Sequence, residues 1–187
     1  MRKLLRRLRR EQDGGAALEF GFIAPAFFML VWGTIELGLL LLGNTLLEGA
    51  VREAARAGLT GYTPTNEDRV TYIRSVVQQF TMGLIDMAKL QIDTKVYSSF
   101  ANIGQPEPFS DQPPYNGVYD AGEPFVDVNG NGKWDADMGV AGLGGPGDVV
   151  VYTLTYPWDF FAGYAQTVFG VPTVTLKASV AIRNEPY

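Results

Sequence analysis

Residues 20–47 read FGFIAPAFFMLVWGTIELGLLLLGNTLL, and this run of 28 residues contains one formal charge, Glu36. A bilayer span needs about 20 consecutive apolar residues, so the run is long enough to cross a membrane. A cleaved secretory signal is one alternative, but the run is longer than a signal's apolar region and no small-x-small site follows it. A buried core helix is the other alternative, and the continuity of the run and its basic flank count against it.

The segment before this run is strongly basic. Residues 1–14 contain six Lys and Arg side chains against Glu11 and Asp13, which gives +4, whereas the whole chain of 187 residues carries −5. The rest of the chain therefore carries −9. Because basic flanks stay on the cytoplasmic side, we expect a single-pass protein of the inner (cytoplasmic) membrane, with its N-terminus in the cytoplasm and its acidic bulk outside.

The composition excludes several kinds of chemistry. The chain contains no Cys and no His, which rules out disulfides, thiolate zinc sites, iron–sulfur clusters and imidazole catalysis. It has no Ser-x-x-Lys, Gly-x-Ser-x-Gly or phosphate-loop motif, and the glycine-rich run at 142–147 lacks a lysine. Its only basic cluster is the N-terminal one, which the topology explains. We therefore expect neither an enzyme nor a nucleic-acid-binding protein.

The junction at residues 11–20 reads EQDGGAALEF. A Gly that closes a basic leader, four small or apolar residues, and a Glu before an aromatic residue resemble the processing site of type IV prepilins of the Flp (tight adherence) branch. The similarity is to TadE-like pseudopilins, and it extends through IELG at 35–38 and EGAVREAARAG at 48–58. It implies a cut by a prepilin peptidase after Gly14, with Gly15 as the new N-terminus and Glu19, followed by Phe20, as the fifth mature residue. A cut after Gly15 would match less well.

Physical chemistry supports this interpretation independently. Gly14 has no Cβ, so its backbone can enter a peptidase site closely. A carboxylate such as Glu19 is costly at the edge of lipid unless paired, and the new α-amino group of a neighbouring subunit is a suitable partner; alternatively, Glu19 only complements the helix dipole. Glu36 is either paired across an assembly or kept protonated, or it lies near the far interface. Pro25 predicts a bend or a local opening of the helix.

The apolar run belongs to a longer predicted helix, from residue 16 to about 58 and roughly 65 Å long. Its first half fits a membrane, whereas its second half is amphipathic and must pack on something outside. We therefore divide the chain into a leader at 1–14, a long helix at 15–61 that Gly58 and Gly61 end, and an extracytoplasmic head at 62–187.

The head is predicted to be a small α+β domain with pilin-like architecture. Apolar spacing predicts an amphipathic helix over 66–88, with Thr65 as its N-cap. Alternating or continuous apolar patterns predict strands over 91–99, 149–156 and about 174–182, which together form an antiparallel sheet. The aromatic segment at 158–169 is either a short helix or a packed loop over the sheet.

An insertion at 101–148 separates the first two strands and holds ten Gly, six Pro, eight acidic residues and one base, Lys133. A loop of this length is functional or disordered. Residues 127–137, DVNGNGKWDAD, match the opening of an EF-hand or dockerin calcium loop. The predicted Ca²⁺ ligands are the side chains of Asp127, Asn129, Asn131 and Asp135 with the Lys133 carbonyl. The twelfth position, normally Glu, is Met138, and Asp137 just before it is a further candidate ligand.

A partial repeat aligns residues 116–123 with residues 131–138. The first copy has the closing Glu123 but lacks the opening acids, so we hypothesise that Glu123 or Asp120 joins Asp127, Asn129, Asn131 and Asp135 around one or two Ca²⁺ ions. The alternative is an acidic, Asn-Gly-rich turn with no metal. Bound calcium would stabilise a loop that has little apolar surface to bury.

The sequence therefore predicts a minor pilin or pseudopilin for assembly of a Flp-type pilus or a related secretion fibre, with a calcium-stabilised head. The implied partners are a prepilin peptidase, other pilin subunits and the inner-membrane assembly platform. The alternative is a single-pass, membrane-anchored protein for calcium-dependent adhesion or binding that enters no fibre.

Overall fold

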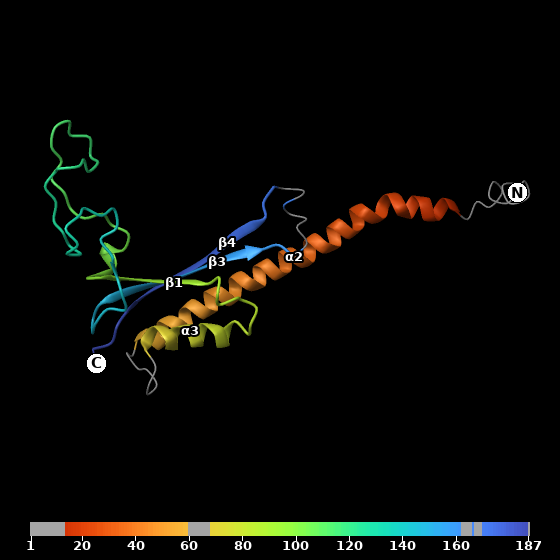
Figure 1. Ribbon diagram of the computed structural model, residues 1–187, viewed down its shortest axis with the longest axis horizontal. Coiled ribbons are helices and arrows are strands. Elements are labelled where there is room, and N and C mark those ends of the chain that lie inside the picture. The colour runs from red at the N-terminus through yellow and green to blue at the C-terminus, as the bar shows by residue number, and fades with distance from the viewer. Residues whose placement is uncertain (1–13, 60–67, 162–165, 167–169, 187) are drawn as a thin grey trace, which may run out of the picture.

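The computed structural model describes residues 14–59, 68–161, 166 and 170–186. Its dominant element is α2 (Gly14–Leu59), a single helix of 46 residues that is roughly 70 Å long at 1.5 Å per residue. α2 continues through Pro25, and the part drawn in red bends away from the line of the rest (Figure 1). The predicted long helix is thus confirmed. The leader up to residue 13 and Gly61 lie outside the described residues.

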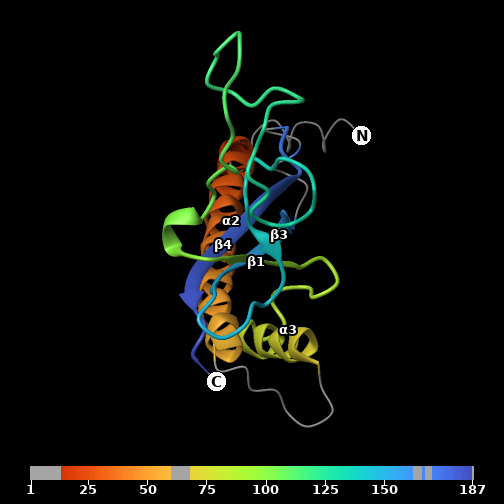
Figure 2. The same ribbon diagram turned by 90° about the vertical axis from the view of Figure 1, so that its left-hand side faces the viewer.

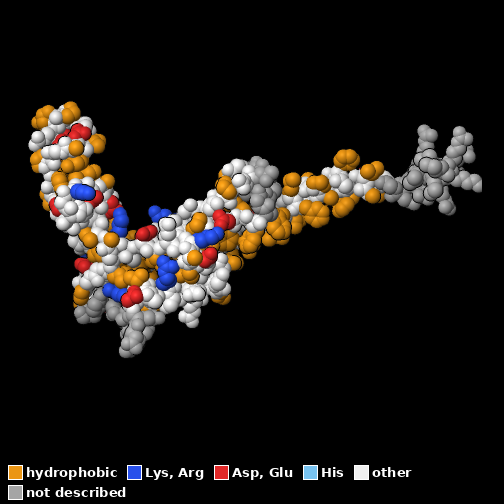
Figure 3. All heavy atoms as spheres, viewed as in Figure 1, with side chains coloured by type: hydrophobic (Ala, Val, Ile, Leu, Met, Phe, Trp, Pro, Cys, Tyr) orange, Lys and Arg blue, Asp and Glu red, His pale blue; other side chains and the backbone are white. Residues whose placement is uncertain are grey.

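The two halves of α2 have different surroundings. Side chains of the first half project freely, with Phe22 84% and Leu30 69% exposed, whereas Leu47 and Ala54 in the second half are fully buried. Mean hydropathy reaches 1.9 in a part of the helix of which only 11% is buried, so α2 is long and apolar enough to cross a membrane. Figure 3 shows the free half as a rod covered with hydrophobic side chains.

The head contains one antiparallel sheet with the strand order β2-β1-β3-β4. The strands are β1 (Gln91–Tyr97), β2 (Val140–Ala141), β3 (Val149–Asp159) and β4 (Thr173–Arg183). The three predicted strands are confirmed, but β1 ends two residues early and β3 continues to Asp159. β2 lies in the insertion and was not predicted, because a pair of residues carries no periodic signal.

The second helix, α3 (Arg69–Phe80), is shorter than the predicted helix over 66–88. The prediction of its C-terminus was wrong because Met82 and Gly83 have φ angles of 49° and 77°, which are not helical. Asp68 caps its N-terminus by accepting a hydrogen bond from the Thr71 N–H. The predicted cap, Thr65, lies outside the described residues.

The core of the head forms where the second half of α2 meets α3 and the sheet (Figure 1). Three glycines on α2 each lie against an aromatic ring. A Cβ would approach Trp158 to 2.5 Å at Gly43, Phe80 to 2.4 Å at Gly49 and Tyr152 to 1.9 Å at Gly58. The absence of side chains at these positions therefore lets α2 pack closely on the head.

We predict that Gly43→Ala destabilises the head. The new methyl group would meet the ring of Trp158, which is only 4% exposed and cannot move aside. Overpacking of this kind costs about 1–3 kcal/mol. The matched control is Gly38→Ala, where nothing lies within 4 Å of the added Cβ. Thermal unfolding of the detergent-solubilised protein should show a lower Tm for Gly43→Ala alone; equal Tm values for both variants would contradict the packing described here.

Candidate functional site

Residues 105–138, here called the arm, extend from the end of the sheet that lies away from the free half of α2 (Figure 1; Figure 2). The arm contains the whole predicted calcium loop. It joins the head at its base, where the Met138 N–H donates to the Gln105 carbonyl at 2.9 Å. Met138 is buried there beside Tyr97 and Val149.

The arm is built from two similar halves. The triplet Glu-Pro-Phe occurs at 107–109 and again at 123–125, and each copy leads into an Asp, Asp111 or Asp127. Phe109 and Phe125 face each other in an antiparallel bridge. Two reciprocal hydrogen bonds flank this bridge, from Ser110 N–H to the Pro124 carbonyl and from Val126 N–H to the Pro108 carbonyl, both at 2.8 Å. The repeat is therefore visible in space as well as in sequence, and it is longer than the predicted one.

Each half is closed by a glutamate that begins a Glu-Pro-Phe triplet. Glu123 accepts hydrogen bonds from the N–H groups of Gln112 and Asp120 in the first half. Glu107 accepts from the equivalent N–H groups in the second half, those of Val128 and Asp135. Glu107 also accepts from Asn129 N–H, and its side chain is fully buried. Glu107, a residue of the first half, thus closes the second.

Glu107 was not predicted as a site residue. The predicted repeat began at residues 116 and 131, after both triplets, and so it did not include this glutamate. An alignment that began at the two Glu-Pro-Phe triplets would have included Glu107. These triplets are 16 residues apart, whereas the equivalent residues that follow them in the two halves are 15 apart. The difference is one extra residue in the first half. Tyr115, which has a φ of 47° there, stands at this point.

The predicted calcium-loop residues of the second half do come together. Asp127 accepts hydrogen bonds from the N–H groups of Gly130, Asn131 and Gly132, which wraps the loop around its carboxylate. The side-chain amides of Asn129 and Asn131 both point at Asp135 Oδ2, at 2.6 and 2.5 Å. Hydrogen bonds from these two amides lower the pKa of Asp135.

The other predicted ligands lie elsewhere. Asp120 accepts from the Asn116 amide and Glu123 bonds within the first half, so neither bonds to the second half. Asp137 forms a salt bridge with Lys95 at 2.6 Å and accepts a hydrogen bond from Tyr97 Oη. No group of three or more acidic side chains within the described ranges is arranged to hold a metal ion. A cation would therefore rely on amide and carbonyl oxygens as well as carboxylates, which Ca²⁺ accepts.

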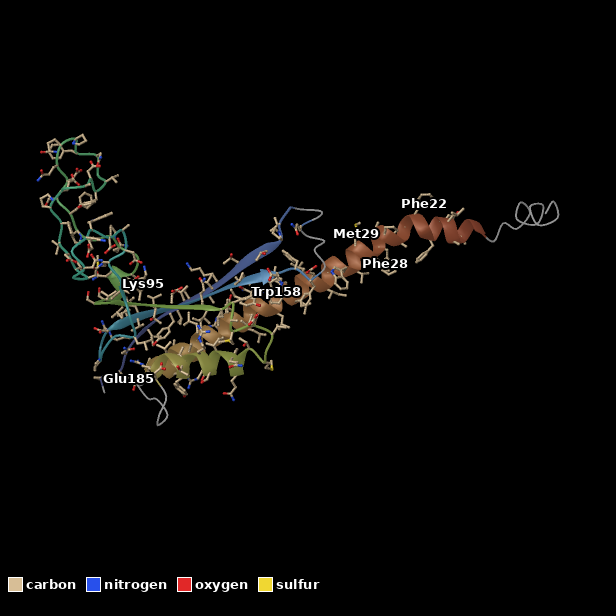
Figure 4. All side chains as sticks on the ribbon, viewed as in Figure 1. Phe22, Phe28, Met29, Lys95, Trp158 and Glu185 are labelled. Carbon is tan, nitrogen blue, oxygen red and sulfur yellow. The ribbon has the colours of Figure 1, made fainter. Side chains whose placement is uncertain are left out.

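An open groove of about 330 Å³ lies between the arm and the edge of the sheet. One side presents Asn129, Asn131, Asp135 and Asp137. The other side is formed by Lys95, Val140 and Ala141, and Figure 4 shows Lys95 where β1 reaches the arm. The polar side chains of the predicted loop are therefore open to small solutes.

Aromatic rings join the two halves. Tyr119 and Trp134, which occupy equivalent positions in the repeat, stack at 4.5 Å with an interplanar angle of 10°. Phe109 meets both of them edge to face, and Trp134 Nε1 donates to the Glu107 carbonyl. Such contacts are worth about 0.5–1.5 kcal/mol per aromatic pair. They hold the halves together where the arm has little other apolar surface.

The predicted processing residues lie at the opposite end of the molecule. Gly14 is the first residue of α2, and Glu19 and Phe20 are exposed on its first turns, with Phe20 60% exposed. Glu36 is different, because only 4% of it is exposed. Its carboxylate accepts a hydrogen bond from the Phe161 N–H of the head.

Comparison with known proteins concerns this end of the chain. Residues 14–56 match the family model described as TadE-like protein. The TadE-like segment begins at the residue predicted to precede the cut and covers nearly all of α2. The predicted resemblance is thereby supported for this part of the chain. Searches of curated proteins and of solved structures gave no match.

We predict that Tyr97 has an unusually high pKa. Burial, together with the hydrogen bond to Asp137, raises the pKa of Tyr97 from 10.0 to about 12. Because the folded-state pKa is raised, the neutral phenol's contribution to stability is complete below pH 10 and is lost as the pH rises through about 12. Absorbance at 295 nm should show a late titration phase for Tyr97, and in Tyr97→Phe the late phase should be smaller by the amplitude of one tyrosine. In Asp137→Asn the midpoint of the Tyr97 titration should fall yet stay above pH 10, because the Tyr97 phenol remains buried.

Proposed function

We propose that this protein is a minor pilin or pseudopilin of a Flp (tight adherence) type IV pilus or a related secretion fibre. The observation that carries the proposal is the TadE-like match at residues 14–56, which coincides with an apolar helix whose first half is largely exposed apart from Glu36. The proposed location is the inner membrane, with the leader in the cytoplasm and the head outside. No enzymatic activity is proposed, since the TadE-like match points to a pilus-associated structural role.

The proposed assembly uses α2 twice. In the membrane, its exposed apolar half is solvated by lipid. In a fibre, the same surface would pack against the helices of other pilin subunits on the assembly platform. Glu19 is exposed one turn into this half, where it can reach the α-amino group that cleavage before Gly15 creates on a neighbouring subunit.

We predict that a prepilin peptidase removes residues 1–14. Mass spectrometry of protein extracted from membranes should find a chain that begins at Gly15, and an intact basic leader would contradict the proposal. Gly14→Leu should abolish the cut, because a bulky side chain would keep the backbone out of the peptidase site. Gly15→Ala is the matched control and should be processed normally, because its small methyl group follows the cut and, with nothing within 4 Å of it, leaves the helix intact.

We further propose that the second half of the arm binds Ca²⁺. The proposed ligands are Asp127, Asn129, Asn131 and Asp135 with the Lys133 carbonyl. Two amide groups converge on one oxygen of Asp135. Rotation of each amide by 180° would turn its oxygen toward the same point, at the cost of the hydrogen bonds that these oxygens accept from the N–H groups of Asn131 and Lys133. A hard cation bound there would bridge three oxygen-bearing groups in exchange.

Glu107 takes the place of the missing twelfth-position glutamate in this proposal. It is held against both ends of the loop by the N–H groups of Val128 and Asp135. Glu107 is fully buried and forms no ion pair among the described residues, so a bound cation would compensate its charge. The role of calcium would be structural, because the ion adds the binding free energy to a segment with little core of its own.

We predict that Ca²⁺ raises the melting temperature of the arm. At a concentration 100 times Kd, binding would stabilise the folded arm by about 2.7 kcal/mol. Asp127→Ala and Glu107→Gln should lose the response, whereas Asp93→Asn, on an exposed position of β1, should keep it. Asp120→Asn distinguishes one bound ion from two. If a second Ca²⁺ ion binds the first half of the arm, this variant should show a smaller calcium-dependent rise in Tm than the wild type; with one ion in the second half, the rise should be unchanged. An unchanged Tm in the wild type with and without calcium would contradict the proposal.

A second candidate function is calcium-dependent adhesion by a membrane-anchored protein outside any fibre. The observation that favours it is the exposure of Tyr115 (71%) and Val118 (62%) on the arm, which lies far from the free end of α2 (Figure 1). Retention of the full leader would favour this candidate over the pilin.

A further inference from the structure

The feature that leads beyond the proposed function is the contact between Glu36 and the end of β3. A bilayer core about 30 Å thick accommodates about 20 helical residues, so a span that begins at Gly15 ends close to residue 35. Glu36 therefore stands at the outer edge of the apolar half of α2. A carboxylate at this depth is expensive when it faces lipid.

The head covers Glu36. Phe161 N–H donates a hydrogen bond to one carboxylate oxygen, and the other oxygen, Oε2, is buried without a hydrogen-bond partner among the described residues. Two turns further along α2, the ring of Trp158 lies against Gly43. The segment at 158–161 is thus attached to α2 at the level where the predicted span ends, as the label of Trp158 beside the helix in Figure 4 indicates.

This segment is aromatic on the side that remains exposed. Phe161 is 71% exposed although its backbone is fixed to Glu36, and Trp32, one turn earlier on α2, is 45% exposed. On the head side of the same segment, Lys89 forms a salt bridge with Asp159 at 2.6 Å. Aromatic rings beside charged groups are typical of the boundary between membrane and water.

We propose that residues 158–161 form a membrane-contacting foot, in which the Phe161 side chain inserts into the outer interfacial layer of the bilayer that α2 crosses. The inference rests on the proposed membrane anchoring of α2. The lipid surface is the occupant because the exposed Phe161 is bonded to Glu36 at the outer end of the predicted span, next to a free half of α2 that is covered with hydrophobic side chains (Figure 3). The foot gives the head a second membrane attachment beside the helix, which fixes its tilt and shields Glu36 from lipid.

The chain contains no Cys, so single cysteines can be introduced into the full protein without a background. We would label Phe161→Cys with a nitroxide, reconstitute the protein in phosphatidylcholine–phosphatidylglycerol nanodiscs, and measure accessibility to O₂ and to a water-soluble nickel chelate. Leu30→Cys is the reference for the span and Val118→Cys the reference for solvent, since both side chains are exposed in the structure, at 69% and 62%. Exposure of Phe161 means that its substitution removes no core contact.

If the foot contacts the membrane, the ratio of O₂ accessibility to nickel-chelate accessibility at residue 161 should be severalfold higher than at residue 118. It should lie closer to the ratio at residue 30. A ratio at residue 161 equal to that at residue 118, with residue 30 in lipid, would overturn the foot while leaving the anchor intact. Shielding of residue 161 from both reagents would indicate a protein contact and would also overturn it. A water-like ratio at residue 30 would overturn the anchoring itself.

Discussion

Three aromatic rings of the head lie against three glycines of α2, and this close contact determines how the molecule is divided. The pairs are Trp158 with Gly43, Phe80 with Gly49 and Tyr152 with Gly58. They come from both the sheet and α3, so both elements are held on the same half of the helix. From Gly15 to Leu37 the side chains of α2 are largely exposed apart from Glu36, which the head covers, and packing against the core begins at Leu39 and Leu40. The free half of α2 therefore requires lipid or other helices.

The two ends of the head consequently face different surroundings. At one end, the segment that follows β3 bonds to Glu36 and presents the exposed side chain of Phe161 beside the apolar half of α2. At the other end, β1 and β3 continue into the arm, which extends away from α2 (Figure 1). The proposed membrane foot and the proposed calcium loop are thus separated by the length of the sheet, which links anchor and arm through one rigid element.

The arm shows how a polar, glycine-rich segment can adopt one conformation with little hydrophobic core. Its halves exchange their closing carboxylates, with Glu107 and Glu123 accepting backbone N–H groups at equivalent positions. The stacked pair of Tyr119 and Trp134 covers the junction between the halves. Asp137, bound by Lys95 and Tyr97, attaches the arm to the sheet. Hydrogen bonds to charged groups are stronger than neutral ones, which suits a segment that cannot rely on burial.

Local patterns in the sequence determined the long helix, the three main strands, the α+β class and the Gly14–Phe20 junction, because hydropathy, periodicity and a contiguous motif depend only on neighbours in the chain. The same holds for the convergence of Asp127, Asn129, Asn131 and Asp135, which lie within one turn. The tertiary structure alone decided the early end of α3, the closure of the second half by Glu107, and the burial of Glu36 under Phe161. Each of these depends on contacts between residues 20 or more positions apart or on a backbone conformation that periodicity does not encode, so no local pattern could specify it.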